Sequence, residues 1–548
     1  MPGCNFKVLE QTVPSGNHVI SMNRIGIIKR FAFVVRKMAF LTLITALFCI
    51  GAGLSCWSQT RPNIVIILAD DLGYGDVQCY NVDRGKIPTP NIDRLAQKGM
   101  RFTDGHSSSA ICSPSRYTLL TGRYHWRSRL QKGIVDMWER PLITPERLTI
   151  AGLAKQAGYH TAAIGKWHLG WNWPITPEDQ PHFTDIGPFE GNTGNGSAPR
   201  SAVTQKDREA WARTFSKPIT GGPTSLGFDT YFGTDVPNWP PFCFIKNEHT
   251  VGIPDELLGR GQVNVNQASF QGPALKDWDL EKVLPTLAIH ATSYIRQQAR
   301  AGSPFLLFFS LTSPHTPLAV EAQWKNKSGL HNEYADFVMQ TDDVVGQVMD
   351  ALKANGIDDK TMVIFLSDNG CGPYIGVKDL ETRGHFASGP LRGYKGDVWE
   401  GGHRTPFIIH YPGITKGDIS DALVLQADIM ATLAEIFDIT LPDNAGEDSF
   451  SLLPLLNGSK RSVREHAVAC RYDGLQSVRQ GSWKLICTKT PQLYNLAHDI
   501  GETTDLASEN PDVVRKILAL QSGLISNGRS TPGPMQKNDV TVNQAFGE

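Results

Sequence analysis

The sequence predicts an α/β protein with one large, mostly parallel sheet flanked by helices, followed by a smaller C-terminal α+β domain. Short apolar segments rich in β-branched residues alternate along the chain with patterns of helical periodicity, as expected of a parallel sheet covered on both faces. Polar residues follow several of these segments, and sheets of this kind bind ligands at the carboxyl ends of their strands. Beyond Pro442 the pattern changes to short strand candidates and one helix.

Five short apolar segments have the composition of strands buried on both faces. The first is the clearest, because it is a continuous run, Asn63 to Ala69, that ends abruptly at two aspartates. The predicted strands are 63–69, 161–164, 305–311, 362–366 and 407–410. The polar residues that follow the first four are Asp70 and Asp71, Lys166 and His168, His315, and Asp368 and Asn369.

Three segments between these strands carry apolar residues at helical spacing. In 90–98, Pro90 suits the first helical position, and Ile92 and Leu95 fall on one face. The segments 150–157 and 334–352 show the same periodicity. The strands and helices together define a predicted catalytic α/β domain over residues 61–438.

Two further regions complete the predicted organisation. Residues 170–285 are rich in Pro, Gly, Trp and Asn and lack long periodic segments, so we expect a loop-rich region laid over the mouth of the sheet. Residues 442–525 predict a small α+β domain, and 526–548 a mobile tail. The elements predicted in the small domain are strands at 467–470, 476–478 and 483–488 and a helix at 511–520.

Composition and charge exclude several classes of protein. The 548 residues include 41% hydrophobic and 20% charged side chains, which is typical of a soluble globular protein. Lys and Arg total 53 against 54 Asp and Glu, so no nucleic-acid partner is expected and an anionic ligand must meet a local cluster. Of the 9 cysteines, those beyond residue 60 are sparse and form no Cys-x-x-Cys pair, which excludes a disulfide scaffold and a zinc ribbon.

The N-terminal region has the layout of an export signal. Arg36 and Lys37 precede an apolar run, 38–50, and small residues follow it. We therefore predict a signal peptide at 38–58 and a periplasmic or secreted protein. A membrane anchor and a lipid attached at Cys56 are the alternatives. Residues 1–37 resemble neither a signal nor a domain, which leaves Met22 and Met38 as alternative starts of translation.

The most informative segment runs from Cys112 to Arg123, with the sequence CSPSRYTLLTGR. We expect residue 112 at the N-terminus of a helix, where backbone N–H groups and the helix dipole attract an anion. Arg116, one turn further on, adds a fixed positive charge. The alternative is an ordinary helix start that contains a buried cysteine, since proline is common near helix N-termini.

This segment resembles the signature of the type I sulfatase family, Cys-x-Pro-x-Arg followed by Thr-Gly-Arg. The resemblance implies an alkaline-phosphatase-like fold and an oxidation of Cys112 to Cα-formylglycine by a formylglycine-generating maturation enzyme. The aldehyde would hydrate to a gem-diol, in which one hydroxyl attacks sulfur and the second later expels the sulfate by elimination. The resemblance covers residues 62 to about 506 and is nearest to the arylsulfatase and N-acetylgalactosamine-sulfatase branches.

Two motifs resemble the metal-binding segments of this family. Asp70-Asp71 with the following Gly-Tyr-Gly-Asp matches the first, and Ser-Asp-Asn-Gly at 367–370 matches the second. The resemblance implies that Asp70, Asp71, Asp368, Asn369 and the oxidised Cys112 bind Ca²⁺. Carboxylate and amide oxygens suit Ca²⁺ or, as the alternative, Mg²⁺. Each motif alone is as typical of a turn.

Three more motifs supply the remaining candidate catalytic residues. Gly-Lys-Trp-His-Leu-Gly at 165–170 resembles the segment whose lysine, here Lys166, contacts sulfate and whose histidine, His168, is the base for elimination. His315, in Ser-Pro-His-Thr-Pro, would protonate or polarise the leaving alkoxide. Lys395 would be a second sulfate ligand, while Glu400 and Arg404 of the same run are interpreted as scaffold.

The leading hypothesis is a sulfatase that hydrolyses sulfate monoesters, of sulfated carbohydrates or of aryl alcohols. Two alternatives are a formylglycine-dependent phosphonate or phosphodiester hydrolase, and an inactive binder of sulfated glycans. Export favours carbohydrate sulfates. The aromatic side chains Trp171, Trp173, Trp239 and Phe242 in the loop-rich region either stack on sugar rings or pack beneath loops.

Overall fold

A computed structural model describes residues 61–184, 203–258 and 270–542. The predicted upstream segment 1–37 and signal peptide 38–58 lie outside the described residues, as does the end of the chain from residue 543. Within the described ranges, no helix is both long and apolar enough to span a membrane.

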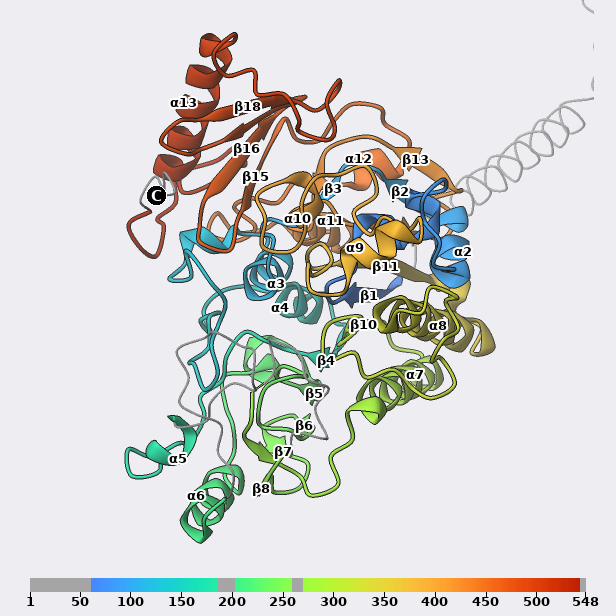
Figure 1. Cartoon of the computed structure of the whole chain (residues 1–548), viewed down its shortest axis with the longest axis vertical. Helices are drawn as coiled ribbons and strands as arrows, with labels where there is room; N and C mark the ends of the chain where they lie inside the picture. Colours follow the sequence, from blue (N-terminus) through green and yellow to red (C-terminus); the bar gives the residue numbers. More distant parts are fainter. Residues whose placement is uncertain (1–60, 185–202, 259–269, 543–548) are drawn as a thin grey trace, which may run out of the picture. The chain divides into compact units, whose positions relative to one another are not determined.

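A ten-stranded mixed sheet forms the centre of the molecule (Figure 1). Its middle is parallel: β1 (Asn63–Ala69) lies between β10 (Phe305–Ser310) and β11 (Thr361–Ser367), and β4 (His160–Lys166) and β5 (Thr230–Thr234) continue the sheet beyond β10. The outer strands are β12 (Phe407–His410), β2 (Met100–Phe102), β13 (Asp418–Ser420), β6 (Ile245–Lys246) and β7 (His249–Thr250).

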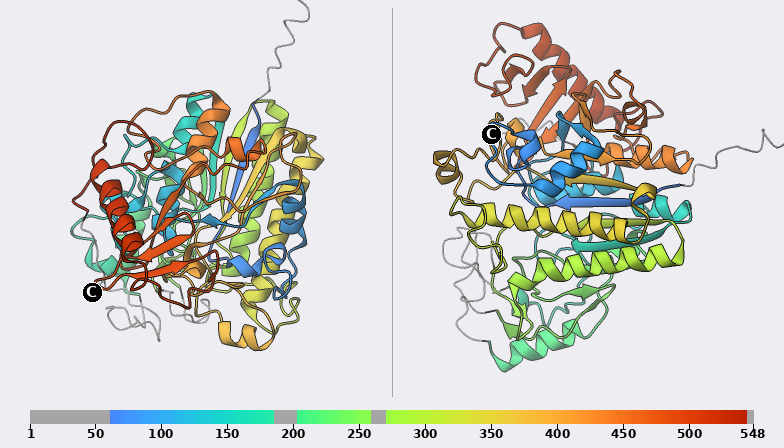
Figure 2. Two further views of the ribbon diagram at one scale, coloured as in Figure 1. Left: turned by 90° about the horizontal axis from the view of Figure 1, so that it is seen from above. Right: turned by 90° about the vertical axis from the view of Figure 1, so that its right-hand side faces the viewer.

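Both faces of the sheet are covered, because successive side chains of each central strand point to opposite sides. In β1, Val65 and Ile67 join the apolar cluster that contains α2 (Pro90–Lys98), α7 (Val283–Ala301) and α8 (Glu333–Ala354). Ile64 and Ile66 join the opposite cluster, with α3 (Cys112–Thr121), α4 (Ile150–Gln156) and α11 (Asp428–Phe437). The view from above and the side view in Figure 2 show helices on either side of the sheet. The predicted fold class is confirmed.

The remaining elements are short or peripheral. The other helices are α5 (Pro181–Thr184), α6 (Gln205–Phe215), α9 (Val377–Thr382), α10 (Glu400–His403) and α12 (Leu453–Leu456). The small strand pairs are β3 (Gly105–His106) with β14 (Val424–Leu425), and β8 (Glu256–Leu257) with β9 (Pro273–Ala274). Single 3-10 turns lie at Tyr74–Asp76, Gln78–Tyr80, His125–Arg127, Pro223–Leu226, Leu280–Lys282 and Asp358–Lys360.

The structure differs from the sequence interpretation in the region 170–285. It contains β5, which pairs in parallel with β4 inside the large sheet, and the helix α6. The strand escapes detection because its residues, Thr-Tyr-Phe-Gly-Thr, include a glycine and two threonines instead of a continuous apolar run. The strand β12 also runs antiparallel to β11.

A second sheet forms the C-terminal part of the chain. Its four antiparallel strands are β15 (His466–Cys470), β16 (Gln476–Gln480), β17 (Trp483–Ile486) and β18 (Gln492–Asn495). The helix α13 (Pro511–Asn527) shares an apolar cluster with this sheet and crosses it in Figure 1.

The segment after α13, for which the sequence predicts a mobile tail, contacts the rest of the fold as far as residue 542. Asp539 accepts hydrogen bonds of 3.1 Å from both terminal nitrogens of Arg123, and Asn538 accepts one of 3.1 Å from Arg127. Ser530 donates to Asp448 at 2.6 Å. Buried arginines near α3 therefore fix this segment, through contacts that are remote in sequence.

We expect Arg127→Ala to lower the free energy of unfolding by about 3–5 kcal/mol, because it leaves Asp448 buried without its charged partner. Arg127 donates to both oxygens of Asp448 at 2.9 Å, and neither side chain is exposed. The measurement is chemical denaturation. The control is Arg94→Ala, since Arg94 pairs with Asp350 at an exposed site and should cost about 0–1 kcal/mol. Equal losses in the two variants would contradict the expectation.

Candidate active site

The carboxyl ends of β4, β10, β1 and β11 meet at one edge of the sheet and carry the predicted site residues. Asp70 follows β1 directly, Lys166 is the last residue of β4, and Asp368 follows β11. His315 lies five residues beyond β10. The strands are parallel, so their ends share this edge, and the structure brings together the groups that the sequence places there.

The helix α3 begins at Cys112, as the sequence predicts, and points its N-terminus into this cluster of charges. Cys112 is 3% exposed. Burial raises the pKa of its thiol to about 11, although Lys166 and Lys395 act in the opposite direction. One turn along the helix, Arg116 reaches across to the strand ends and donates two hydrogen bonds to Asp368, at 2.7 and 3.1 Å.

Asp70 is fully buried between two cations. The Lys166 ammonium lies 3.0 and 2.8 Å from its two carboxylate oxygens, and Arg116 lies 3.2 Å from one of them. Burial alone would raise the pKa of Asp70, but these cations, Lys166 foremost, hold it well below its ordinary value. Asp70 is therefore ionised in spite of its burial.

Asp71 is held by contacts from four directions. It has φ of +63°, its backbone N–H donates to Asp368 at 3.1 Å, and its carboxylate accepts from Asn369 at 2.8 Å. Lys395 lies 2.7 Å from the same carboxylate, and the Tyr374 hydroxyl donates to it at 2.9 Å. Burial would raise the pKa of Asp71, but Lys395, His315 and Lys166 together lower it.

The segment after β4 aims His168 at the site. Gly165, with φ of +112°, permits this path, because a Cβ there would lie 1.7 Å from the carbonyl oxygen of Ser310 on β10. The Nε2 of His168 lies 3.2 Å from the Val135 carbonyl, which can only accept, so Nε2 carries the proton. Nδ1 is then a bare acceptor, and it is buried with no hydrogen-bond partner among the described residues.

The two histidines are neutral for the same physical reason. Burial lowers the pKa of His168 well below its ordinary value, and Lys166 and Arg116 act in the same direction. Burial and Lys395 lower the pKa of His315 to about 4. The Nδ1 of His315 lies 2.5 Å from the carbonyl of Thr316, and its Nε2 is 3.6 Å from Asp71. His315 therefore turns Nε2 towards Asp71.

The donor set at this edge fits a hard divalent cation. Side-chain atoms of Asp70, Asp71, Cys112 and His315 lie within 4.8 Å of one another. The Oδ1 of Asn369 is buried and has no hydrogen-bond partner within the part of the chain that the structure describes. An amide oxygen left without a donor beside three carboxylates matches what Ca²⁺ or Mg²⁺ requires.

A second buried group of possible ligands, His106, Glu400 and His403, does not fit a cation. Lys484 lies 3.0 Å from Glu400 and 3.4 Å from His403, and Arg404 lies 3.2 Å from Glu400. This group offers only one carboxylate, already paired with these cations, whereas the cluster around Asp70 has three carboxylates and the unpartnered Oδ1 of Asn369. The contacts agree with the scaffold role that the sequence suggests for Glu400 and Arg404.

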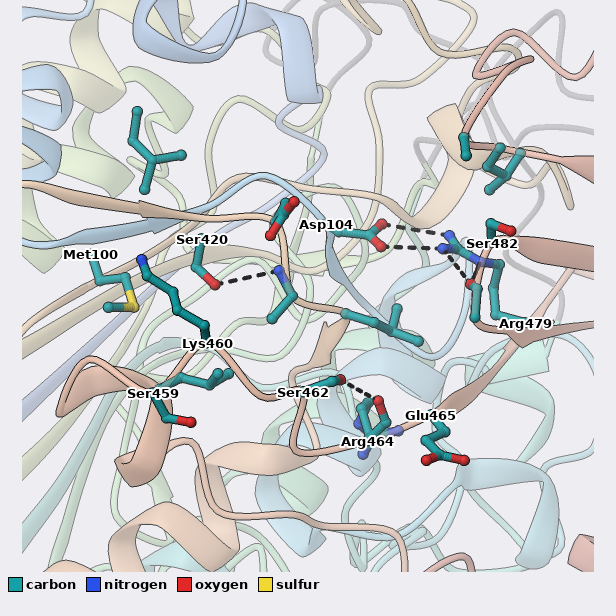
Figure 3. A pocket seen from close by; sticks show the side chains of 18 of the residues that line it. Met100, Asp104, Ser420, Ser459, Lys460, Ser462, Arg464, Glu465, Arg479 and Ser482 are labelled. Carbon is teal, nitrogen blue, oxygen red and sulfur yellow. Dashed lines mark hydrogen bonds and ion pairs between the residues drawn. The ribbon is translucent and has the colours of Figure 1, made fainter.

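A cavity of about 620 Å³ lies apart from the cluster around Cys112, between the outer strand β13 and the C-terminal sheet (Figure 3). Asp104 accepts from Arg479 at 3.2 Å in its wall, and Arg464 lines it as well. Arg464 is committed to Asp428, to which its Nε donates at 3.0 Å. Asp104, Arg464 and Arg479 in the wall of the cavity are thus already paired inside the fold.

Three residues of the site were not predicted from the sequence. Asp235, after β5, accepts from the His168 backbone at 3.2 Å and from the Trp171 indole at 3.1 Å. Ser310 accepts from Arg116, and Tyr374 binds Asp71. Of the three, only Ser310 could have been noticed in the sequence, because it is the one polar residue of β10 and ends its apolar run.

The candidate aromatic side chains of the loop-rich region pack inside the protein. Trp171 and Phe242 are each 1% exposed, and Trp239 is 9% exposed with its ring 5.3 Å from that of His168. Trp173 packs against Trp138 and Phe215. Of the two roles considered for these side chains, Trp171 and Phe242 therefore have the second, packing beneath loops.

Comparisons with known proteins agree with the geometry. The family model described as Sulfatase matches residues 62–439. The N-acetylgalactosamine-6-O-sulfatase of Bacteroides thetaiotaomicron is 30% identical over 84% of this chain and 93% of its own length. Human arylsulfatase A is 29% identical over 87% of this chain and 89% of its own. A solved structure from glycosaminoglycan metabolism by B. thetaiotaomicron superposes with a TM-score of 0.70 and 29% identity, covering 85% of this chain and 99% of that one.

We expect the Cys112 thiol, in protein made without any maturation activity, to resist alkylation. With a pKa of about 11, against about 8.5 for a free cysteine, its thiolate fraction at pH 8 is about 240-fold smaller than in an unfolded chain. The rate should rise with pH up to about 11. The measurement is iodoacetamide labelling with EDTA present, followed by mass analysis of the peptide, and guanidinium-unfolded protein is the control. Equal rates in the folded and unfolded protein would refute the buried thiol.

Proposed function

This chain belongs to the sulfatase family, and from that membership we propose that it hydrolyses sulfate monoesters of carbohydrates with a formylglycine derived from Cys112. The chain is a sulfuric ester hydrolase. The observation that carries the finer proposal is the position of Cys112: it is the first residue of α3, buried among Lys166, Lys395, Asp70 and Asp368.

The sulfate group would bind where positive charge converges. Lys166, Lys395 and Arg116 come from a strand end, a loop and a helix, and all three contact the buried aspartates. Backbone N–H groups at the start of α3 add to this positive potential. Because the cations sit in a water-poor site, they stabilise a sulfuryl group more strongly than they would in water.

The nucleophile and the cation are the two groups that maturation and metal binding would add. Formylglycine would supply a hydrated aldehyde, whose two hydroxyls provide a nucleophile and a means of releasing sulfate. A Ca²⁺ ion held by Asp70, Asp71, Asp368 and Asn369 would supply Lewis-acid stabilisation of negative charge. The ion-binding role is supported by the unpartnered Oδ1 of Asn369.

His168 is suited to act as a base. Because the Val135 carbonyl fixes the proton on Nε2, Nδ1 offers a lone pair that no described side chain occupies. Val135 also donates its N–H to Ser113, the residue after Cys112, at 3.1 Å. The same segment thus orients the base and touches the start of α3. We assign His168 the proton that must leave for sulfate to be eliminated.

His315 is suited to donate a proton to the leaving oxygen only when it is doubly protonated. The Thr316 carbonyl holds the Nδ1 proton, so Nε2 must gain a second proton before it can donate one. A bound sulfate ester brings negative charge to His315 and would raise its pKa from about 4. Substrate binding would thereby charge the general acid.

The substrate class and cell location are parts of the same proposal. The relatives are named for N-acetylgalactosamine-6-sulfate and for aryl sulfates, and the apolar run at 38–50 favours export. We therefore propose an exported enzyme that acts on sulfated carbohydrates outside the cytoplasm.

The first test is the mass of the tryptic peptide 102–116, from protein made in a host with a formylglycine-generating activity. We expect the aldehyde or its hydrate at residue 112, and we expect Cys112→Ala to lose sulfate release by at least about 1000-fold while it keeps the wild-type Tm. Cys371→Ala is the control for removing another buried thiol. An unmodified thiol, or sulfate release undiminished in Cys112→Ala, would refute the proposed nucleophile.

The second test addresses the cation. We expect saturating Ca²⁺ to raise the Tm of the chelator-treated wild type, since a ligand present at 100 times its Kd adds about 2.7 kcal/mol to stability. Asn369→Leu should lose this response together with sulfate release. Asn355→Leu, at the end of α8, provides a matched asparagine loss and should keep both. A full Ca²⁺ response in Asn369→Leu would remove this residue from the metal site.

A further inference from the structure

Two tyrosines have the most exposed rings among the Phe, Trp and Tyr side chains that the structure describes. Tyr472 is 57% exposed and Tyr374 is 39% exposed. Aromatic rings usually bury most of their surface, so an exposed ring is informative where it borders a functional site. Both tyrosines border Lys395, although one follows the large sheet and the other belongs to the C-terminal sheet.

Tyr472 is fixed to the loops that flank the active site. Its backbone N–H donates to the carbonyl of Gly396 at 3.3 Å, and its own carbonyl accepts from Gly133 at 2.7 Å. Gly396 follows Lys395, and Gly133 lies two residues before Val135, which orients His168. The ring of Tyr472 lies over Gly396: a Cβ built there would be 3.9 Å from the ring's Cδ1.

The turn that carries Tyr472 is rigidly tied to the start of α3. Cys470, two residues earlier, donates to Ser108 at 3.0 Å and accepts from Ala110 at 2.9 Å, just before Cys112. Within the turn, Arg471 donates to Asp473 at 2.9 Å, and its guanidinium lies 5.9 Å from the Tyr472 ring. These bonds hold the backbone of the turn that carries Tyr472 next to the start of α3.

Tyr374 is anchored at its hydroxyl, which donates to Asp71. Its ring packs over Gly372, where a Cβ would lie 2.5 Å from the ring. A glycine is therefore needed for the ring to take this position. Tyr374 keeps its polar end in the site and leaves its ring partly open at the surface.

We propose that Tyr472 and Tyr374 form a sugar-binding rim, on which a pyranose ring of the sulfated substrate stacks. This inference rests on the proposed function. The C–H faces of a pyranose are apolar, whereas its hydroxyls favour water, so a rigid, half-exposed aromatic ring suits such a ligand at little cost in side-chain entropy. Tyr472 is a substrate-binding residue in this scheme, and the C-terminal sheet supplies part of the specificity.

The test measures binding and turnover separately. The probe is the disaccharide that wild-type protein desulfates fastest, chosen from monosulfated chondroitin, carrageenan and heparan disaccharides. We expect Tyr472→Ala to raise KM about 10-fold with kcat within about twofold, because a lost contact of equal strength in ground and transition states changes KM alone. In the Cys112→Ala background, calorimetry should show the same loss of affinity.

Two variants calibrate this result. Tyr472→Phe keeps the ring and should retain affinity within about twofold. Ile289→Ala removes an apolar side chain that is 63% exposed on α7, and it should leave KM and kcat unchanged.

Each of the following outcomes would overturn the proposed sugar-binding rim. Unchanged KM in Tyr472→Ala overturns it, as does an equal loss in Ile289→Ala. Wild-type protein that releases sulfate from 4-nitrophenyl sulfate but from none of the disaccharides overturns the rim and leaves the sulfatase activity intact. Protein that carries formylglycine but releases sulfate from no probe overturns the proposed function, and the rim falls with it.

Discussion

The rest of the site depends on the neutralisation of buried carboxylates by buried cations. Asp70, Asp71 and Asp368 are removed from water at the ends of β1 and β11, and burying such charges alone would be prohibitive. Lys166, Lys395 and Arg116 compensate for them. The same three cations supply the positive charge that we propose binds the sulfate group of the substrate.

A second buried network of charged side chains connects the C-terminal sheet to the domain of the large sheet. Lys484, on β17, is 0% exposed and pairs with Glu400 at 3.0 Å and with Glu502 at 2.7 Å. Glu400 opens the short helix α10, and its backbone N–H also donates to Glu502. The loop of Lys395 lies just before α10. The C-terminal sheet therefore braces the short helix α10, which follows the loop that carries Lys395.

The sequence was most informative where a pattern is local. The strand at 63–69 and the helix at 90–98 match the structure residue for residue, because apolar runs and a proline at the first helical position are local signals. The positions of the candidate site residues that follow strand ends could be predicted from the sequence in the same way. Asp235 was not, because its strand β5 lacks an apolar run, and Tyr374 and Tyr472 were not, because their importance depends on exposure and on contacts remote in sequence.

The packing of Asp539 against Arg123 has a consequence for the order of events during synthesis. These two residues are separated by 416 positions, so Arg123 gains this charged partner only after residue 539 has left the ribosome. Contacts of such long sequence separation form late, because the loop they close is costly in entropy. Until Asp539 has been synthesised, Arg123 therefore lacks this charged partner.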